Sequence, residues 1–186
     1  MSIETSRRQF SSTDFRKMAE HGIINEDERV ELIDGEVCTM SPIGPRHMAI
    51  VRRLNEFFIQ SLAGRATIGV QDSIELNDFT QPQPDITVLR KRADYYSSQL
   101  ARPEDILLVV EVADSSLHFD HHEKVPRYAA AGIREVWLVD VESETVSQFT
   151  EPRGDAYQSM KSFVRGQTID AMTSIGLSLS VVDILG

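Results

Sequence analysis

Two short apolar segments, each carrying one acidic residue, most constrain the fold of this chain. Residues 83–89 (QPDITVL) and 106–112 (ILLVVEV) are rich in β-branched residues, which is typical of core strands. Asp85 opens the first strand and Glu111 closes the second. If the strands pair antiparallel, both acids lie at the same edge of the sheet. Converging buried carboxylates repel each other and lose hydration, and a hard divalent cation relieves both penalties. The two segments therefore predict a metal-dependent site.

The size and composition are those of one globular domain spanning residues 1–186. The chain is 41% hydrophobic and 26% charged, and its length is sufficient for a substantial core. No apolar run reaches membrane-spanning length, and the polar first ten residues lack the apolar centre of a signal peptide. The lone cysteine, Cys38, suits a reducing compartment. We therefore expect a cytoplasmic protein with no membrane partner.

The net charge of −10 argues against a protein that binds nucleic acid indiscriminately, because phosphate affinity comes from lysine and arginine. The charge is unevenly distributed, however. Between Pro45 and Arg92, seven basic residues outnumber five acidic ones. A local basic patch fits this excess, and so does an ordinary solvated helix face.

The spacing of apolar residues predicts an α+β domain built on a mixed β-sheet flanked by helices. Helices are expected at 12–20, from Pro45 to about Gly64, and at 122–131, with Pro126 in or near the first turn of the last one. A tight turn at Asp34 and Gly35 predicts an N-terminal β-hairpin. The expected strands are 29–33, 36–40, 66–70, 73–76, 85–89, 105–112, 134–140 and 145–149, followed by a β-rich C-terminal tail with short strands near 157–159, 168 and 177–181.

Phosphodiester hydrolysis at a two-carboxylate site also needs a basic side chain, which orients the nucleophile or stabilises developing charge. Two residues after Glu111, on the same strand face, the chain has Ala113. Lys124 is the candidate instead. We expect it in the first turn of the next helix, where it opposes the helix dipole unless acids lie nearby. Asp120 precedes it by four residues and shares its helix face. The alternative is an ordinary surface lysine.

Two further residues are candidate members of the site. Glu31 interrupts the apolar run 30–33, and it either joins the other acids or faces outward, paired with Arg29. His47 opens the long helix that begins at Pro45. Its imidazole either hydrogen-bonds a phosphate or a metal-bound water, or it caps the helix at the surface.

A cluster of three histidines, His118, His121 and His122, raises the question of zinc. His118 and His122 are four residues apart, but no second ligand pair with zinc spacing accompanies them. The chain also lacks the glycine-rich loop of a phosphate-binding site and the Gly-x-Ser-x-Gly motif of a serine hydrolase. The sequence thus favours the acidic site over these alternatives.

The chain resembles the Uma-type family of restriction endonucleases, within the PD-(D/E)XK nuclease superfamily. The resemblance extends from about Phe10 to Asp140 and depends on the combination of several short stretches. They are 30–37 (VELIDGEV), 40–42 (MSP) followed by His47, 84–86 (PDI), 111–117 (EVADSSL), Asp120 with Lys124 and Tyr128, and 131–140 (AGIREVWLVD).

The resemblance implies a restriction-endonuclease-like core and a Mg²⁺ or Mn²⁺ ion held by Asp85 and Glu111. In the superfamily a lysine usually stands two residues after the strand acid, and Ala113 occupies that position here. The resemblance implies that Lys124, on the next helix, takes the role of this lysine. DNA is the substrate that such a family implies.

These observations predict a divalent-metal-dependent endonuclease that hydrolyses DNA phosphodiester bonds. Its metal ligands would be Asp85 and Glu111, and a homodimer would let two sites cut both strands. The alternative is a nuclease-fold protein without catalytic activity that binds a partner or regulates, which the net acidity and Ala113 favour. A metal-dependent phosphoesterase for a small substrate is a third reading. The candidate catalytic residues are Asp85, Glu111, Lys124, Glu31, His47 and Asp120.

Overall fold

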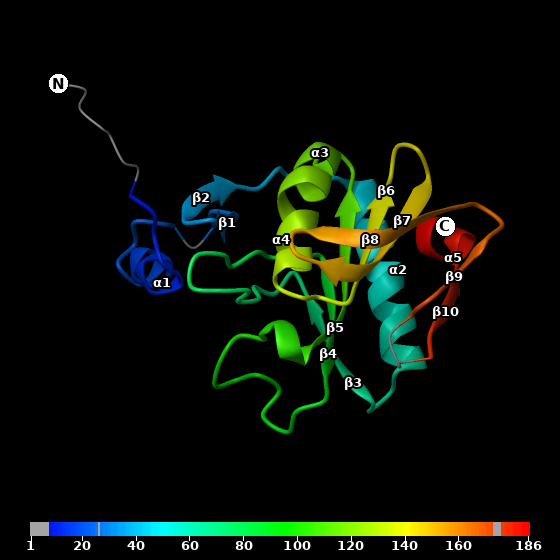
Figure 1. Cartoon of the computed structure of the whole chain (residues 1–186), viewed down its shortest axis with the longest axis horizontal. Coiled ribbons are helices and arrows are strands. Elements are labelled where there is room, and N and C mark those ends of the chain that lie inside the picture. The colour runs from blue at the N-terminus through cyan, green and yellow to red at the C-terminus, as the bar shows by residue number, and fades with distance from the viewer. Residues whose placement is uncertain (1–7, 26, 173–175) are drawn as a thin grey trace.

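The protein has an α+β fold organised around one mixed sheet (Figure 1). The computed structural model describes residues 8–25, 27–172 and 176–186. Six strands form the main sheet in the order β3-β4-β5-β6-β7-β8. Only the β5–β6 pair among them is parallel. The six strands are β3 (Ala66–Val70), β4 (Ile86–Arg90), β5 (Ile106–Ala113), β6 (Glu135–Asp140), β7 (Thr145–Arg153) and β8 (Ala156–Val164).

Alternating residues of β4 and β5 fill two separate parts of the core. On one face, Val88 and Val110 pack with the apolar side of helix α2 (Pro45–Ser61), which buries Leu54 and Phe58. On the other face, Leu89 and the neighbouring apolar residues of β5 pack with helix α4 (Val125–Ala130). Because both faces are covered, the two strands are apolar along almost their whole length, which explains their sequence pattern. The single acid in each strand is therefore exceptional.

The predicted antiparallel pairing of these two strands is confirmed. Ile86 lies opposite Val110, so Asp85, just before β4, is adjacent to Glu111 and Val112 at the end of β5. The backbone N–H of Val112 donates to Asp85 Oδ2 at 2.9 Å. The acids therefore lie at one edge of the sheet, as their sequence positions indicated.

Two small strand pairs flank the main sheet. The N-terminal hairpin joins β1 (Val30–Ile33) and β2 (Glu36–Thr39) through the predicted turn, and β9 (Thr168–Asp170) pairs with β10 (Ser178–Ser180) near the C-terminus. Helix α1 (Ser12–Glu20) has the predicted bounds, and its Ser11 cap and Asp14 form a capping box. A last helix, α5 (Val181–Leu185), was not predicted, since its apolar residues follow directly on strand β10.

The structure corrects two strand predictions. Residues 73–76 are not a strand, although Ile74 and Leu76 are buried. They belong to a connecting segment that packs its apolar side chains into the core, and only an isolated bridge joins Ile74 to Ala101. Strand β7 continues four residues beyond the predicted end at Phe149, because its partner β8 pairs with it as far as Arg153.

The predicted start of the helix around Lys124 was wrong. Helical structure begins at Leu117, five residues before the predicted start at His122, as α3 (Leu117–Phe119), and runs through a π-helical turn, η2 (Asp120–Lys124), into α4. Pro126 therefore follows two turns of helix. The Val125 N–H donates to the Asp120 carbonyl five residues back, and this wider turn makes room for a proline ring that would clash within a regular α-helix.

Within the described ranges, none of the helices is both long and apolar enough to cross a lipid bilayer. Residues 1–7 of the polar N-terminal stretch considered above lie outside the described residues.

Candidate active site

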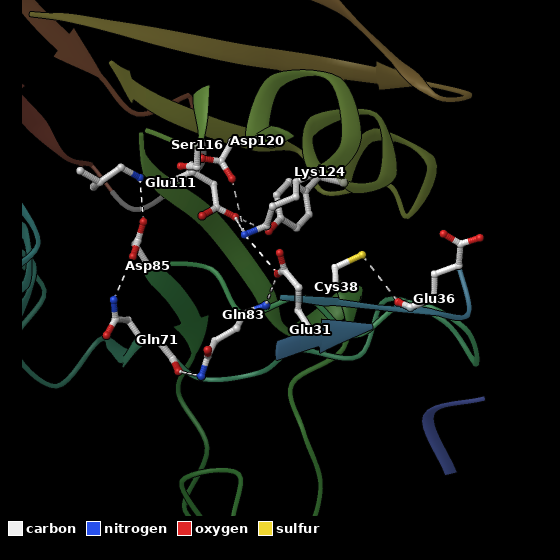
Figure 2. Close-up of polar contacts among 12 residues, drawn as sticks. Glu31, Glu36, Cys38, Gln71, Gln83, Asp85, Glu111, Ser116, Asp120 and Lys124 are labelled. Carbon is white, nitrogen blue, oxygen red and sulfur yellow. Dashed lines mark hydrogen bonds and ion pairs between the residues drawn. The ribbon is translucent and has the colours of Figure 1, made fainter. Parts of the chain in front are cut away.

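All six predicted site residues line one cleft of about 330 Å³. The cleft lies where the start of β4 and the end of β5 meet the N-terminal hairpin, helix α2 and the π-helical turn η2 (Figure 2). Every one of the six side chains is buried, with a relative exposure between 2% and 8%. These residues are Glu31, His47, Asp85, Glu111, Asp120 and Lys124.

Lys124 is the hub of the cleft, not a surface lysine. Its Nζ lies 2.7 Å from Glu111 Oε1, 3.4 Å from Glu31 Oε2 and 3.8 Å from Asp120 Oδ1. Burial alone lowers the pKa of the ammonium group, but these three acids outweigh that effect and raise it. Lys124 is therefore a permanent positive charge. Because it lies inside the helical segment, the expected conflict with a helix N-terminus does not arise.

Glu111 is the most deeply buried acid of the cleft. Its Oε1 accepts hydrogen bonds from the Lys124 ammonium group and, at 2.5 Å, from the Tyr128 hydroxyl. The pKa of Glu111 is raised to about 8, chiefly by burial; the Lys124 ammonium group lowers it in part, and the charges of Asp120 and Asp85 add to the rise. Glu111 Oε2 receives no hydrogen bond from the residues that the structure describes.

Asp85 is held by three donors. His47 Nε2 lies 3.0 Å from Oδ2, which also accepts the Val112 N–H, and Gln71 Nε2 donates to Oδ1 at 3.1 Å. Burial raises the pKa of this carboxyl, but the His47 contact and the other two donors outweigh burial and lower it overall. Asp85 is thus ionised across the physiological range.

Glu31 reaches the cleft from the N-terminal hairpin. It points neither outward nor toward Arg29, whose guanidinium donates to the Ser41 carbonyl instead. The Glu31 Oε2 atom accepts the backbone N–H of Gln83 at 3.1 Å and faces Lys124. Figure 2 shows the two side chains pointing toward each other from strand β1 and the helical segment.

Asp120 completes the ring of acids around the lysine. The Ser116 hydroxyl donates to its Oδ2 at 2.5 Å, which leaves Oδ1 directed toward Lys124. Burial raises the pKa of Asp120, although Lys124 and the Ser116 hydrogen bond lower it in part. The π-helical turn places these two residues on the cleft side.

The histidine cluster is a stack of rings at the end of the cleft. The His118 and His122 rings are stacked with their centroids 4.4 Å apart, and His122 Nδ1 lies 3.0 Å from the His118 carbonyl oxygen. The His121 ring packs edge-on against Phe149. Stacked rings do not converge their nitrogen atoms on one point, as tetrahedral zinc coordination requires.

The sequence of almost the whole chain identifies its family. A family model described as "Putative restriction endonuclease", Uma2, matches residues 12–182. The chain belongs to the Uma2 family.

A solved structure supports the fold of this Uma2 protein. It is the crystal structure of a protein from Anabaena variabilis ATCC 29413 described as a putative nuclease belonging to DUF820. The two structures match with a TM-score of 0.72 at 16% sequence identity, over 95% of this chain and 97% of that chain. No curated protein matches the chain at a significant level. The Uma2 chain therefore has a nuclease-like fold, with a mixed sheet flanked by helices.

The Uma2 cleft has the charge and the donor atoms that a hard divalent cation requires. Three carboxyl groups lie within 4 Å of the Lys124 ammonium group, and that of Asp85 lies in the same cleft, so four fully ionised acids would exceed the one lysine by three negative charges. Mg²⁺ is commonly held by one or two carboxylates and completes its shell with water. Asp85 and Glu111 supply such a pair. Among the described residues, no group of three or more His, Cys, Asp or Glu side chains forms a ready-made metal site.

Sequence reasoning missed the neutral residues that position the acids of this Uma2 cleft. The Gln71 side-chain amide donates to Asp85. The backbone N–H of Gln83 donates to Glu31, and its side-chain amide donates to the Gln71 carbonyl at 2.5 Å. Tyr128 appeared only as part of the family pattern, yet it is fully buried against Glu111. An amide in a loop carries no periodic signal, so the only available clue was proximity to Asp85 in sequence.

Proposed function

We propose that this protein is a divalent-metal-dependent endonuclease that hydrolyses phosphodiester bonds of DNA. The carrying observation is the buried cleft that holds four acids and one lysine, with three of the acids within 4 Å of the lysine Nζ. An excess of buried negative charge destabilises a fold when no cation neutralises it. In a site that binds a doubly charged cation, the same acids attract the ion. Membership of the Uma2 family supports the same reaction class.

In this proposal Asp85 and Glu111 hold Mg²⁺ or Mn²⁺. When bound, the ion acts as a Lewis acid toward the phosphate and lowers the pKa of a coordinated water. His47, Val112 and Gln71 fix the Asp85 carboxylate, so it needs little reorganisation to serve as a ligand.

Lys124 stabilises negative charge in the proposed reaction and does not act as a base, because its neighbours raise its pKa and it keeps its proton. It also supplies the basic group that Ala113 cannot provide from the strand. Glu31 and Asp120 also lie within 4 Å of the ammonium group, and these contacts restrict its orientation.

The direct test is cleavage of supercoiled plasmid DNA by the purified protein with Mg²⁺ or Mn²⁺. We expect nicked or linear products with the ion and none with EDTA. Glu111→Gln and Asp85→Asn should reduce the rate by at least about a hundredfold, since each removes a proposed ligand. Glu104→Gln, at an exposed acid outside the cleft, is the matched control. Full activity in both cleft variants would contradict the assignment of the ligands.

The main alternative is a nuclease-fold protein that binds a partner without cutting DNA. It predicts no metal-dependent product at any protein concentration, together with binding that survives Glu111→Gln.

A homodimer stays a prediction, and light scattering of the protein as it elutes from a gel-filtration column tests it. If the protein is a dimer with two sites, linear product should form directly from supercoiled DNA without accumulation of the nicked form.

A further inference from the structure

A second cleft, of about 410 Å³, lies beside the proposed active site. Strands β3 and β4 line it, together with residues 71–74 and the loop that carries Tyr95 and Tyr96. Gln83 lines both clefts, so they share a wall. Thr87 is in β4, two residues and about 7 Å along the chain from Asp85. A nucleic acid held at Asp85 would therefore extend naturally into the second cleft.

The floor of the second cleft contains buried hydroxyl groups that lack a partner. Thr87 is 1% exposed, and its Oγ1 has no hydrogen-bond partner. The same holds for Oγ1 of Thr67 on the neighbouring strand. An unpaired buried hydroxyl costs free energy, which a bound polar group would recover. The Thr87 hydroxyl lies directly against Gly69, where an added Cβ would collide with Oγ1.

Two tyrosines with strained backbones form the rim of the second cleft. Tyr95 and Tyr96 both have positive φ angles, +50° and +63°, which are unfavourable for residues with a bulky side chain. The Tyr95 side chain is 65% exposed although it borders the cleft. The Lys91 ammonium group lies 4.4 Å from the centre of its ring. An exposed aromatic ring next to a basic side chain is the combination on which nucleobases stack beside their phosphates.

Asp72 adds an acceptor to the lining of the second cleft. Burial raises the pKa of its carboxyl, and a hydrogen bond from the backbone at Val70 lowers it only in part. A carboxylate in this position favours a base whose edge presents N–H donors. Guanine has two adjacent donors of this kind, so it matches both carboxylate oxygens at once.

We propose that the second cleft binds one unstacked guanine base of the DNA strand whose phosphate lies at Asp85 and Glu111. This inference rests on the proposed nuclease function and names a substrate feature: a strand with an unpaired or extruded guanine next to the cut. The base stacks on Tyr95, the hydroxyl of Thr87 finds a partner, and Asp72 accepts from the base edge.

The test compares two short fluorescein-labelled single strands by anisotropy, with Ca²⁺ in place of Mg²⁺ to prevent cleavage. One is an oligothymidylate, and the other carries one central guanine. We expect the wild-type protein to bind the guanine strand about tenfold more tightly, since a bidentate contact with the base edge is worth at least that factor. Asp72→Asn and Thr87→Val, which remove contacts with the base edge, should each remove most of this preference, whereas Tyr95→Ala should weaken the binding of both strands.

Thr87→Val also separates a ligand site from a packing defect. Replacing an unpaired buried hydroxyl with a methyl group of the same shape should leave the melting temperature unchanged or raise it. A loss of the guanine preference in this variant is then not explained by a loss of stability. Thr150→Val, another buried threonine outside the cleft, is the matched control and should keep the preference. Equal affinity of the wild type for both strands, or an intact preference in Thr87→Val, would overturn the inference.

Plasmid cleavage with Mn²⁺, measured on the same preparations, distinguishes the two proposals. Cleavage without a guanine preference refutes the base site and leaves the nuclease function standing. A guanine preference without any cleavage supports the base site and refutes the nuclease function.

Discussion

At the scale of single residues, the cleft depends on one positive charge that offsets several buried negative ones. The Lys124 ammonium group is within 4 Å of three carboxyl groups, and its side chain is 3% exposed. Such a network gives little net stability compared with an apolar core, but removing one member leaves the others unpaired. A substitution in this cleft should therefore change stability more than the same substitution at an exposed residue of the same type.

Lys124→Met should destabilise the protein by about 3 kcal/mol near neutral pH, because three buried acids lose their cation. Urea unfolding followed by circular dichroism measures this change. The exposed Lys161→Met provides the control and should change stability by less than about 0.5 kcal/mol. If the two lysine variants unfold at the same urea concentration, the ion-pair network contributes nothing to the fold.

Metal affinity should depend on pH through Glu111. A ligand carboxylate must be ionised, and without a metal Glu111 has a pKa of about 8. Below this pH a proton competes with the ion, so the apparent affinity for Mn²⁺ should fall about tenfold for each pH unit between 8 and 6. Titration calorimetry at several pH values measures this slope. Glu111→Gln should bind Mn²⁺ weakly, with almost no dependence on pH. If the Mn²⁺ affinity of the wild-type protein does not depend on pH, Glu111 is not a ligand.

At the scale of secondary-structure elements, five separate segments must meet for the cleft to exist. The N-terminal hairpin is not part of the main sheet, since β1 and β2 form a sheet of their own. A bidentate ion pair connects its turn to helix α4: Arg127 donates through Nε and Nη2 to Asp34 Oδ2 at 3.1 and 2.7 Å. This contact holds the hairpin beside the helical segment that carries Lys124.

Arg127→Ala should loosen the hairpin more than it weakens the whole fold. Because the ion pair is largely exposed, the global stability should fall by less than about 1 kcal/mol. Backbone amides of residues 30–39 should exchange with deuterium several times faster, and plasmid cleavage should decrease because Glu31 is less well placed. Arg134→Ala, which removes an exposed arginine near the end of the same helix, is the control. Unchanged exchange in the hairpin would contradict this role of the ion pair.

At the scale of the whole molecule, the acidic cleft makes stability depend on pH and on divalent ions together. The pKa of Glu111 is raised from 4.5 to about 8 by folding, so the folded state binds one proton more than the unfolded state between these values. Stability therefore decreases as the pH rises through this window, by up to about 1.4 kcal/mol per pH unit. Asp85, whose pKa is lowered, is ionised in both states above pH 5 and adds no slope there.

Without divalent ions, the melting temperature should decrease by about 5 °C between pH 6 and pH 8. Millimolar Mg²⁺ should restore most of this loss at pH 8 and little at pH 6, where protonated Glu111 cannot bind it. Differential scanning calorimetry with and without EDTA measures both effects. The Glu111→Gln variant should lose the Mg²⁺ response, and a wild-type melting temperature that rises with pH would contradict the raised pKa of Glu111.

Local sequence patterns determined much of the fold of this protein. Apolar runs of β-branched residues specify β4 and β5, and the register of one acid in each run places Asp85 and Glu111 at the same edge. These predictions succeed because alternation and capping are short-range effects. Sequence spacing also pointed to Lys124 as the basic residue, and its shared helix face with Asp120 is again a short-range property.

Only the tertiary structure decided which neighbours each site residue has. Glu31 and His47 lie far from Asp85 in sequence, and both alternatives for each were compatible with their local pattern until the hairpin and helix α2 packed around the sheet. The π-helical turn before Pro126 and the amides of Gln71 and Gln83 carry no periodic signal. The raised pKa of Glu111 comes from burial and from charges on other segments, so it exists only once long-range contacts have formed.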